Sequence, residues 1–520
     1  MRKYFFSFLF LGLVSTSLAQ TPFRIAGFYS PEALYTRQFE PVDIPADELT
    51  HLFYAFVIPK DINGDGYYEA VWANTDIVQH AFFSRSLIPR DTSRIDRRGV
   101  LRQLVHLKRK HPHLRILLSL GGTCSYDQVT GSCNALHERF VQISQNPAHR
   151  EVFINTLIQL FTNPMGDGSV LGLFDGLDVD WEFPGAGEKA TFVLFMQTLR
   201  DKLDEIGSKR KERYVLTFDG PATSYFLQHY DVPALAKIVD WVNVMAYLYH
   251  MPQPWNPHTG HLAPFAGNIA DGHGSGYNVQ EMSVAAWIKA GMPPEKISLG
   301  LPYFGVGYTG VKAGKKDLLP GLFQTYHGPL VPSGEVPYAD LWSETPSYRE
   351  ASLYWDESAK AAFLYNRSKK IWISLETPQS LFIKTQWAKQ KGLSGVFVWE
   401  LSQEAMGGSG QAPLTRSIGL AARSAASAIP EQGILVEACT PHLPIRCTFQ
   451  LTLHRAEVVE ITLKGNTEAI QLQKQKRLSP GLYQYHHTGT WQALDGYHVE
   501  VTIGMQKQVF TVRPGVFNRL

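Results

Sequence analysis

Four acidic side chains lie close together in an otherwise apolar stretch, LFDGLDVDWEFPG at residues 173–185. In a β-strand, alternate side chains share a face, so Asp178, Asp180 and Glu182 point one way while the apolar residues between them point the other. Stacked and buried carboxylates cannot all ionise at low cost, because each negative charge raises the pKa of its neighbour. At least one should keep its proton, and a protonated Glu182 at the end of the strand is a general acid.

Two other interpretations would also bring acidic residues together, a solvated strand face and a calcium site. The flanking Leu, Val, Trp and Phe residues are too apolar for a solvated face. A calcium site normally draws on a looping chain with carbonyl ligands. We therefore interpret the stretch as catalytic.

Short apolar strands alternate with helix-like stretches along most of the chain. Eight such units predict an α/β fold, a (β/α)8 TIM barrel. The carboxylates would then climb the inside of the fourth strand, with Glu182 at the C-terminal mouth where barrel active sites lie. Before the last strand, Thr377 as a cap, Pro378 in the first turn and Gly392 at the end predict a helix. The predicted strands cover residues 23–30, 49–58, 114–122, 173–183, 214–222, 239–250, 296–305 and 395–402.

Two segments fall outside this alternation. Residues 306–375 are rich in Gly, Tyr and Trp and predict an inserted small α+β subdomain, which divides the catalytic barrel into residues 20–305 and 376–428. Residues 429–520 alternate strand-like runs with Gly and Pro, which is typical of a C-terminal β-sandwich-like domain. That domain could bind polysaccharide, serve as a spacer or dock other proteins.

Residues 1–19 have the pattern of a secretory signal peptide, with a basic start at Arg2 and Lys3, a short apolar stretch and a small residue at the cleavage point. Without those two residues the chain has 47 basic and 47 acidic side chains, so we expect no nucleic acid partner. No later stretch reaches transmembrane length, so no membrane partner is expected either. We expect a secreted or extracellular protein, or a periplasmic one.

Four cysteines in an exported chain favour two disulfides. Their spacing pairs Cys124 with Cys133 and Cys439 with Cys447. A metal site would need His or Cys partners at tighter spacing, so the cysteines predict no metal.

A weaker motif, DINGDGYYE at residues 61–69, matches the front half of a calcium-binding loop. Trp72 stands where such a loop has its final glutamate, so Glu69 would have to serve instead. A turn rich in Asn, Asp and Gly is the commoner explanation. We predict no metal and no cofactor for this chain.

The stretch FDGLDVDWE resembles the DGxDxDWE signature of the family 18 glycoside hydrolases, the chitinases, and this signature is highly specific. The resemblance covers almost all of residues 23–420 and extends to LTHLFYAF, SLGG, NVMAY and GVFVWEL in the second, third, sixth and eighth strands. The insertion lies where many members of the family carry a chitinase insertion domain. The resemblance implies that the substrate is chitin or another N-acetylglucosamine-containing oligosaccharide.

The resemblance also implies a substrate-assisted, retaining mechanism, in which the substrate's own N-acetyl carbonyl attacks the anomeric carbon. Glu182 would protonate the glycosidic oxygen as general acid. Asp180 would hold the acetamido N–H, and Asp178 would balance the charge beneath it. Tyr247 would steady the acetamido oxygen, and Trp399 would form an aromatic floor for the sugar ring.

The sequence also departs from the pattern that the resemblance implies. Leu248 stands where an aspartate usually helps bind the acetamido group, Val306 replaces an arginine, and Thr123 replaces a tryptophan. Asp219 lies on the inward face of the fifth strand, where the family usually has a small apolar residue. We hypothesise that Asp219 supplies the carboxylate missing at Leu248. An ion pair or polar contact inside the barrel would be a purely structural reason for Asp219.

Two further residues, Met245 and Tyr303, are expected to contact substrate together with Trp399 and Asp219. Three functions remain open at this point: a secreted chitinase, an endo-β-N-acetylglucosaminidase that cleaves N-glycans, and a non-catalytic relative that binds chitin or oligosaccharide. The presence of the acid Glu182 favours an enzyme, and the insertion favours a long linear polymer such as chitin. Protein partners and oligomeric state have no readable pattern.

Overall fold

The structure is a computed structural model of the 520-residue chain. The ranges that it describes are residues 22–89, 98–122, 133–254, 256–267, 278–314, 319–342, 345–404, 412–424, 433–439, 445–453, 457–464, 469–478, 481–489, 498–503 and 506–511. The predicted signal peptide therefore lies outside the described residues.

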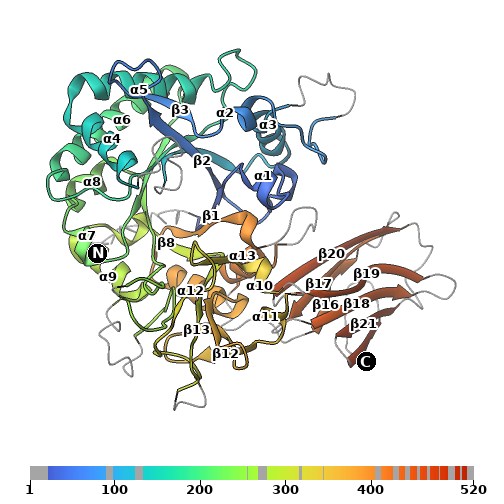
Figure 1. Ribbon diagram of the computed structural model, residues 1–520. Coiled ribbons are helices and arrows are strands. Elements are labelled where there is room, and N and C mark those ends of the chain that lie inside the picture. The colour runs from blue at the N-terminus through green and yellow to red at the C-terminus, as the bar shows by residue number, and fades with distance from the viewer. Residues whose placement is uncertain are drawn as a thin grey trace, which may run out of the picture.

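Eight parallel strands form a closed barrel (Figure 1). β1 pairs with β2 on one side and with β15 on the other, with Ala26 opposite His51 and Arg24 opposite Gly395, and these two pairings close the ring. The (β/α)8 prediction is confirmed. The barrel strands are β1 (Arg24–Tyr29), β2 (His51–Lys60), β4 (Arg115–Gly121), β5 (Gly176–Asp180), β6 (Val215–Gly220), β7 (Trp241–Val244), β8 (Ile297–Pro302) and β15 (Gly395–Trp399), and the short β3 (Glu69–Trp72) pairs antiparallel with β2.

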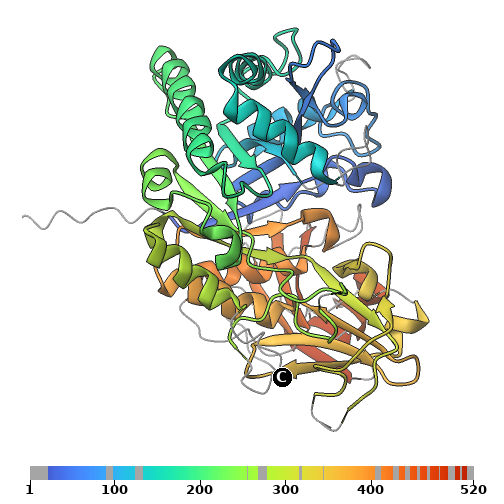
Figure 2. The same ribbon diagram turned by 60° about the vertical axis from the view of Figure 1, so that its left-hand side comes forward.

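Helices cover the outside of the barrel, and their apolar faces complete a core with the outward side chains of the strands. The longest, α6 at Lys189–Arg210, lies outside the barrel strands in both Figure 1 and Figure 2. The other helices of this part are α1 (Ala33–Thr36), α2 (Thr75–Gln79), α3 (Val100–Lys110), α4 (Cys133–Gln145), α5 (Pro147–Thr162), α7 (Ser224–Leu227), α8 (Val232–Ile238), α9 (Gln280–Ala290), α12 (Pro378–Gln390) and α13 (Pro413–Arg423).

The ends of α12 show how local sequence sets the helix. The Thr377 hydroxyl accepts a hydrogen bond from the backbone N–H of Ser380 at 3.3 Å, and the Ser380 hydroxyl accepts one from the backbone N–H of Thr377 at 2.8 Å. Pro378 occupies the first turn, where its missing N–H costs nothing. Gly392 then adopts φ +71°, which ends the helical path. The predicted cap, first turn and end are all confirmed.

A second sheet is inserted between β8 and α12. Its central strand β9 begins at Phe304, only one residue after β8 ends, so the sheet grows directly out of the barrel wall. All its pairings are antiparallel, and Val306 of β9 lies opposite Glu335 of β11. Its elements are β9 (Phe304–Thr309), β10 (Gly328–Pro329), β11 (Glu335–Pro337), α10 (Tyr338–Leu341), α11 (Pro346–Arg349), β12 (Ser352–Asp356), β13 (Ala361–Asn366) and β14 (Ile371–Leu375).

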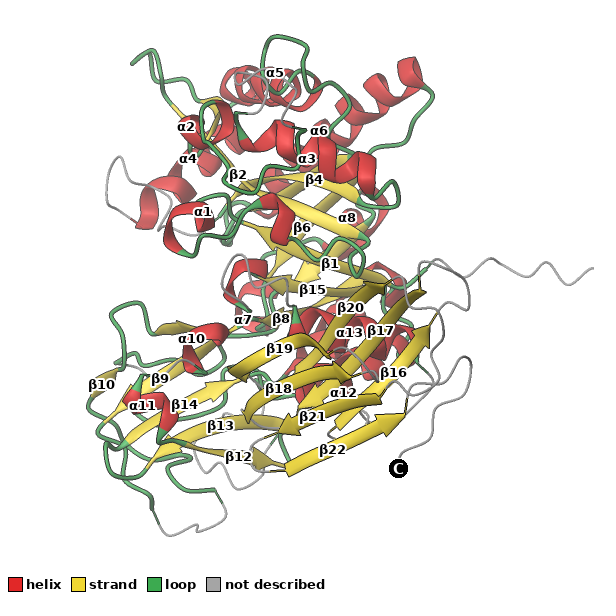
Figure 3. Ribbon diagram, turned by 90° about the vertical axis from the view of Figure 1, so that its right-hand side faces the viewer, coloured by secondary structure: helices red, strands yellow, loops and turns green. Residues whose placement is uncertain are grey.

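The C-terminal region contains two antiparallel sheets, which lie together beside the insertion in Figure 3. The register of the first sheet puts Cys439 opposite Cys447. Cys124 lies outside the described residues, and for Cys439 and Cys447 only the backbone register is described. Both disulfides therefore remain predictions. One sheet contains β16 (Gly433–Cys439), β17 (Ile445–Leu453) and β20 (Gly481–Gly489), and the other contains β18 (Glu457–Lys464), β19 (Ala469–Leu478), β21 (His498–Ile503) and β22 (Gln506–Thr511).

Two barrel strands are shorter than expected, and their ends shape the mouth. β5 ends at Asp180, so Glu182 lies in the turn above it. β7 ends at Val244 rather than near residue 250, because the chain turns and Leu248 adopts φ +59°, a conformation uncommon for a residue other than glycine. This turn holds Tyr247 and Leu248 at the mouth. Among the described residues, no helix combines the length and apolarity needed to cross a membrane.

Candidate active site

Asp178 is the deepest of the three carboxylates, and its negative charge is well supported by hydrogen bonds. Its carboxylate accepts bonds from the Ser119 hydroxyl at 2.7 Å, the Thr217 hydroxyl at 2.5 Å and the Asn243 amide at 3.3 Å. These donors come from β4, β6 and β7, so neighbouring strands all aim a polar group at β5. Burial raises the pKa of Asp178 to about 6, although the bonds from Thr217 and Ser119 oppose that rise.

Asp180 lies one step higher on β5 and lacks the support that Asp178 has. It is 4% exposed, and its Oδ1 atom is buried with no hydrogen-bond partner among the described residues. Burial, together with the nearby charges of Glu182 and Asp178, holds the pKa of Asp180 well above its usual range. An N–H donor brought by a ligand would satisfy the free oxygen.

A glycine brings β4 close to Asp180. Gly121 has φ +119°, and a Cβ atom on it would lie 2.0 Å from the backbone oxygen of Asp180. Only glycine allows both this backbone conformation and this close approach. The SLGG motif therefore has a direct role in positioning Asp180.

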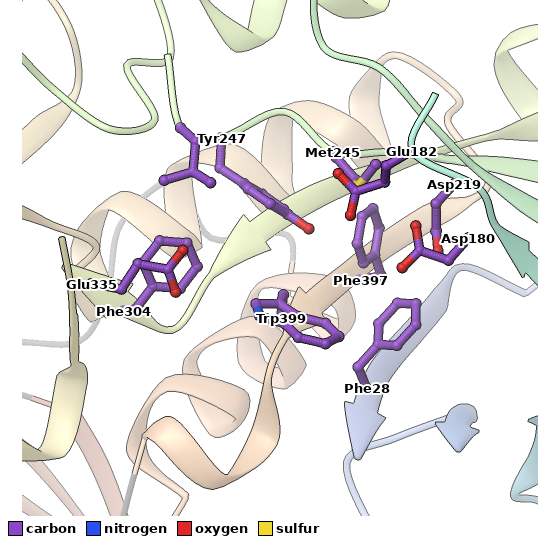
Figure 4. A pocket seen from close by; sticks show the side chains of 11 residues that line it. Phe28, Asp180, Glu182, Asp219, Met245, Tyr247, Phe304, Glu335, Phe397 and Trp399 are labelled. Carbon is purple, nitrogen blue, oxygen red and sulfur yellow. The ribbon is translucent and has the colours of Figure 1, made fainter. Parts of the chain in front are cut away.

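Asp219, on β6, is the most poorly satisfied carboxyl group of the site. It is 2% exposed, and both of its carboxylate oxygens are buried without a hydrogen-bond partner in the described part of the chain. Figure 4 shows its carboxyl group beside that of Asp180. Burial, with the charges of Asp178 and Asp180, holds the pKa of Asp219 well above its usual range. A structural ion pair for Asp219 is therefore not present among the described residues.

Glu182 is half-buried at the top of this group and lines a pocket at the C-terminal mouth of the barrel (Figure 4). Burial, with a smaller contribution from the charge of Glu335, raises the pKa of Glu182 to about 7. A carboxyl group with this pKa is protonated in a large fraction of molecules near neutral pH, as a general acid must be.

Aromatic side chains form the rest of the pocket. Trp399 packs against Phe28 and Phe56, with ring centroids 5.4 Å and 5.8 Å away. The ring of Tyr247 lies 6.1 Å from that of Phe304 and 6.3 Å from that of Phe397, centroid to centroid. Burial and the charges of Asp219 and Glu182 hold the pKa of Tyr247 well above its usual range, so it keeps an O–H to donate.

The pocket encloses about 460 Å³ of space not filled by atoms, including the space at its open mouth. It brings together most of the residues expected from the sequence. The lining residues are Phe28, Asp180, Glu182, Asp219, Met245, Tyr247, Leu248, Phe304, Glu335, Phe397 and Trp399.

Tyr303 is not in this pocket. It is 1% exposed, packs in the outer core, and its hydroxyl lies 2.9 Å from the hydroxyl of Thr415. Its neighbour Phe304 lines the pocket instead. The chain passes from β8 to β9 at Tyr303, and this break resets which side chain faces inward. The expectation of a substrate contact at Tyr303 was therefore placed one residue too early.

Of the three positions that depart from the family pattern, one lies in the pocket, one lies in the core of the insertion, and one is not described. Leu248 lines the pocket, so an apolar side chain occupies the place of the expected aspartate. Val306 is fully buried in the core of the insertion sheet. Thr123 lies outside the described residues.

Sequence reasoning missed four lining residues: Phe28, Phe304, Glu335 and Phe397. Phe397 could have been found, because it shares a strand face with Trp399 two positions later. Glu335 had no comparable indication, since β11 has only three residues and reaches the pocket through its pairing with β9.

The loop at residues 61–69 satisfies its own acidic groups. Asp61 accepts bonds from the backbone N–H groups of Gly64 at 2.6 Å and Gly66 at 3.0 Å. Glu69 accepts a bond from the Asn63 amide at 2.6 Å. These contacts fit the turn explanation. Within the described ranges, no group of three or more His, Cys, Asp or Glu side chains is arranged to hold a metal ion.

Comparison with known proteins places these features in one family. The model of "Glycosyl hydrolases family 18" matches residues 24–404. Chitinase A1 of Niallia circulans is 28% identical over 427 residues, which cover 75% of this chain and 57% of that protein. Chitinase 1 of Aphanocladium album is 29% identical over 398 residues, 74% of this chain and 82% of that protein. Chitinase ChiA74 from Bacillus thuringiensis has the same fold, with a TM-score of 0.65 and 21% identity. The match covers 96% of this chain and 87% of that one.

Proposed function

Because the chain belongs to glycosyl hydrolase family 18 and is chitinase-like, we propose that it hydrolyses β-1,4-linked N-acetylglucosamine polymers by a substrate-assisted, retaining mechanism. One observation supports this most directly. Asp180 lines the pocket together with Glu182, and its buried Oδ1 atom has no hydrogen-bond donor among the described residues. The N–H of an acetamido group would provide that donor.

In the proposed reaction, Glu182 donates its proton to the glycosidic oxygen as the bond to the anomeric carbon breaks. The acetamido carbonyl oxygen of the same sugar attacks that carbon and gives a cyclic oxazolinium ion. Glu182, now ionised, takes a proton from water, which opens the ion with a second inversion. The product keeps the configuration of the substrate, and Glu182 regains its proton.

The protein's other residues would orient the acetamido group. Asp180 accepts its N–H, and the tyrosine O–H of Tyr247 donates to its oxygen. Asp178 sits beneath, where three donors stabilise its charge. The ring of the reacting sugar rests on Trp399, whose own packing against Phe28 and Phe56 fixes its plane.

We further propose that Asp219 takes over the contribution of the aspartate missing at Leu248. Both positions line the same pocket, and Asp219 stands beside Asp180 with two free oxygens. A carboxyl group held with a high pKa can share its proton with Asp180 and so support the charge that Asp180 carries when it binds the N–H.

The insertion favours a linear polymer over a branched N-glycan. Phe304 and Glu335 of the insertion extend the wall of the pocket beyond the barrel itself, and a longer wall offers contacts to successive sugars. Among the described residues, we find no contact that favours cleavage of N-glycans by an endo-β-N-acetylglucosaminidase.

The test is incubation of the purified chain with N-acetylglucosamine oligomers and, separately, with an N-glycoprotein. We expect the oligomers to be cleaved and the first product to carry the β configuration, read by NMR within the first minutes. Release of N-glycans without oligomer cleavage would favour the endo-β-N-acetylglucosaminidase. Binding without cleavage of either substrate would favour a non-catalytic protein.

We also propose that the chain is exported and that residues 1–19 are removed. The pattern of residues 1–19 supports this. N-terminal sequencing of the protein recovered from the medium or the periplasm should begin near Gln20, and an intact Met1 on the mature protein would contradict export by this route.

A further inference from the structure

The pocket is strongly acidic at both of its ends. Four of its eleven lining residues are carboxylic acids, and none is Lys, Arg or His. Asp219, although 2% exposed, leaves both oxygens without a partner among the described residues. A binding site built for neutral sugars alone does not require so many acids, since hydroxyl and amide groups satisfy one another without a net charge. This excess of carboxyl groups over bases favours a ligand that brings hydrogen-bond donors of its own, a cationic donor included.

Glu335 is the one acidic lining residue that has no role in the proposed reaction. Figure 4 shows it at the end of the pocket opposite Asp180 and Asp219, with Tyr247 and Trp399 between. It is half-buried on β11, and burial alone raises the pKa of its carboxyl group to about 7, with no charged or hydrogen-bonding partner contributing in the described part of the chain. If the reacting sugar rests on Trp399 as proposed, Glu335 lies beside that sugar rather than beneath it.

The other acids nearby in the insertion are paired with bases. Asp340 pairs with Arg37 at 3.2 Å, and Glu350 pairs with Lys369 at 3.5 Å. Glu357 pairs with Lys360. Glu335 differs from all three, because it lines the pocket and has no basic partner among the described residues. A cationic group on the substrate would provide the partner that the Glu335 carboxylate lacks.

We propose that Glu335 forms a subsite for a sugar with a free ammonium group, so that the substrate includes partially deacetylated N-acetylglucosamine polymer. The inference rests on the proposed function. The sugar on Trp399 must keep its acetamido group, because that group is the nucleophile. A neighbouring glucosamine unit has no such constraint, and its ammonium group would pair with the carboxylate of Glu335.

The experiment compares two substrates with the full-length protein: fully acetylated hexamer, and half-acetylated polymer whose products are sequenced by mass spectrometry. The quantity measured is the ratio of kcat/KM on the half-acetylated to that on the acetylated substrate. Glu335→Gln should lower this ratio about tenfold, as expected when one hydrogen bond to a charged group is lost. The sequenced products should also lose glucosamine next to the cleaved unit.

Two variants serve as controls. Glu335→Asp keeps the charge and should keep most of the ratio. Glu350→Gln removes the same charge from the outer surface of the insertion and should give the wild-type ratio. Raising salt from about 50 mM to about 500 mM should also reduce the wild-type ratio, because screening weakens charge pairing.

A wild-type ratio within twofold of that of Glu335→Gln would overturn the inference while leaving hydrolysis of the acetylated hexamer established. A wild-type protein that leaves the hexamer intact would instead overturn the proposed function, and the inference with it. If Glu335→Gln is unfolded, as judged by its Tm, the salt series on the wild-type protein is the test. A wild-type ratio of kcat/KM values that does not change with salt would contradict the subsite.

Discussion

Two groups of buried carboxylates in this protein look alike in their acidity and differ in their hydrogen bonds. Near α13, Glu404 accepts bonds from the backbone N–H groups of Leu414 and Thr415 at 2.8 Å and 3.0 Å. At the barrel mouth, Asp180 and Asp219 keep three buried oxygens without a partner among the described residues. Burial raises the pKa of Glu404 to about 7, and burial with the charge of Glu335 does the same for Glu182.

A raised pKa therefore does not separate a structural acid from a functional one in this chain. Hydrogen-bond satisfaction separates the acids that would contact a ligand, because a carboxylate stabilised by the protein itself, such as Glu404 or Asp178, has no oxygen to spare, whereas a binding carboxylate reserves its oxygens for the ligand. The Glu376–Lys384 ion pair, also buried, belongs with Glu404 on the structural side.

The largest expected effect on kcat comes from replacing Glu182, and the same replacement at Glu404 provides the comparison. Glu182→Gln removes the transferable proton with little change of shape and should lower kcat about a thousandfold, within the range for general acid catalysis. Glu404→Gln should keep most of the activity but lower the free energy of unfolding by about 1–3 kcal/mol, because it disturbs a satisfied buried group. Steady-state kinetics and denaturant unfolding measure both. Hydrolysis by Glu182→Gln within tenfold of wild type would remove Glu182 from the role of acid.

Asp180→Asn should lower kcat about a hundredfold, because the amide weakens the alignment of the attacking acetamido group. The same change should raise Tm, since it removes a carboxyl group that burial and its acidic neighbours disfavour as an ion. Kinetics and thermal unfolding on the same preparation test the two effects together. A drop in Tm together with unchanged kcat would place Asp180 among the structural acids.

A smaller effect tests Asp219 against the missing aspartate. Asp219→Ala should lower kcat/KM by about tenfold, and Leu248→Asp in that background should restore part of it, because both positions line the same pocket. Asp219→Asn serves as the control that keeps the shape. If the two substitutions act on the rate independently in a double-mutant cycle, Asp219 does not compensate for Leu248.

The smallest effect is a displacement of the pH profile. In the proposed mechanism Glu182 must be protonated to act, so kcat/KM should fall as pH rises through about 7. The negative charge of Glu335 helps raise that pKa, so Glu335→Gln should move the falling limb to lower pH. Glu404→Gln should leave the limb in place. A limb that stays fixed in Glu335→Gln would mean that Glu335 does not act on Glu182 through its charge.

Much of the site could be predicted because it follows strand periodicity. Asp178 and Asp180 share a face of β5, and Trp399 ends the last barrel strand. Prediction failed where a strand ends or changes sheet. Tyr303 falls at the break between β8 and β9, so alternation no longer indicates which side chain turns inward.

Glu335 could not be predicted for a different reason. Its place depends on the pairing of β11 with β9, a contact between segments about 30 residues apart in a region of short strands. The sequence around it has neither a clear period nor a specific motif. The hydrogen bonds of Asp178 could not be predicted either, because the donors come from three other strands.

The closure of the barrel by β1 and β15 has a consequence for how the chain is made. Arg24 pairs with Gly395, 371 positions later. At about 5–20 residues per second, a ribosome needs roughly 20 to 75 s to supply that partner. Until then one edge of β1 has unpaired backbone groups, which can pair with other chains. Newly made protein should therefore depend on chaperones that shield this edge until the last strand arrives.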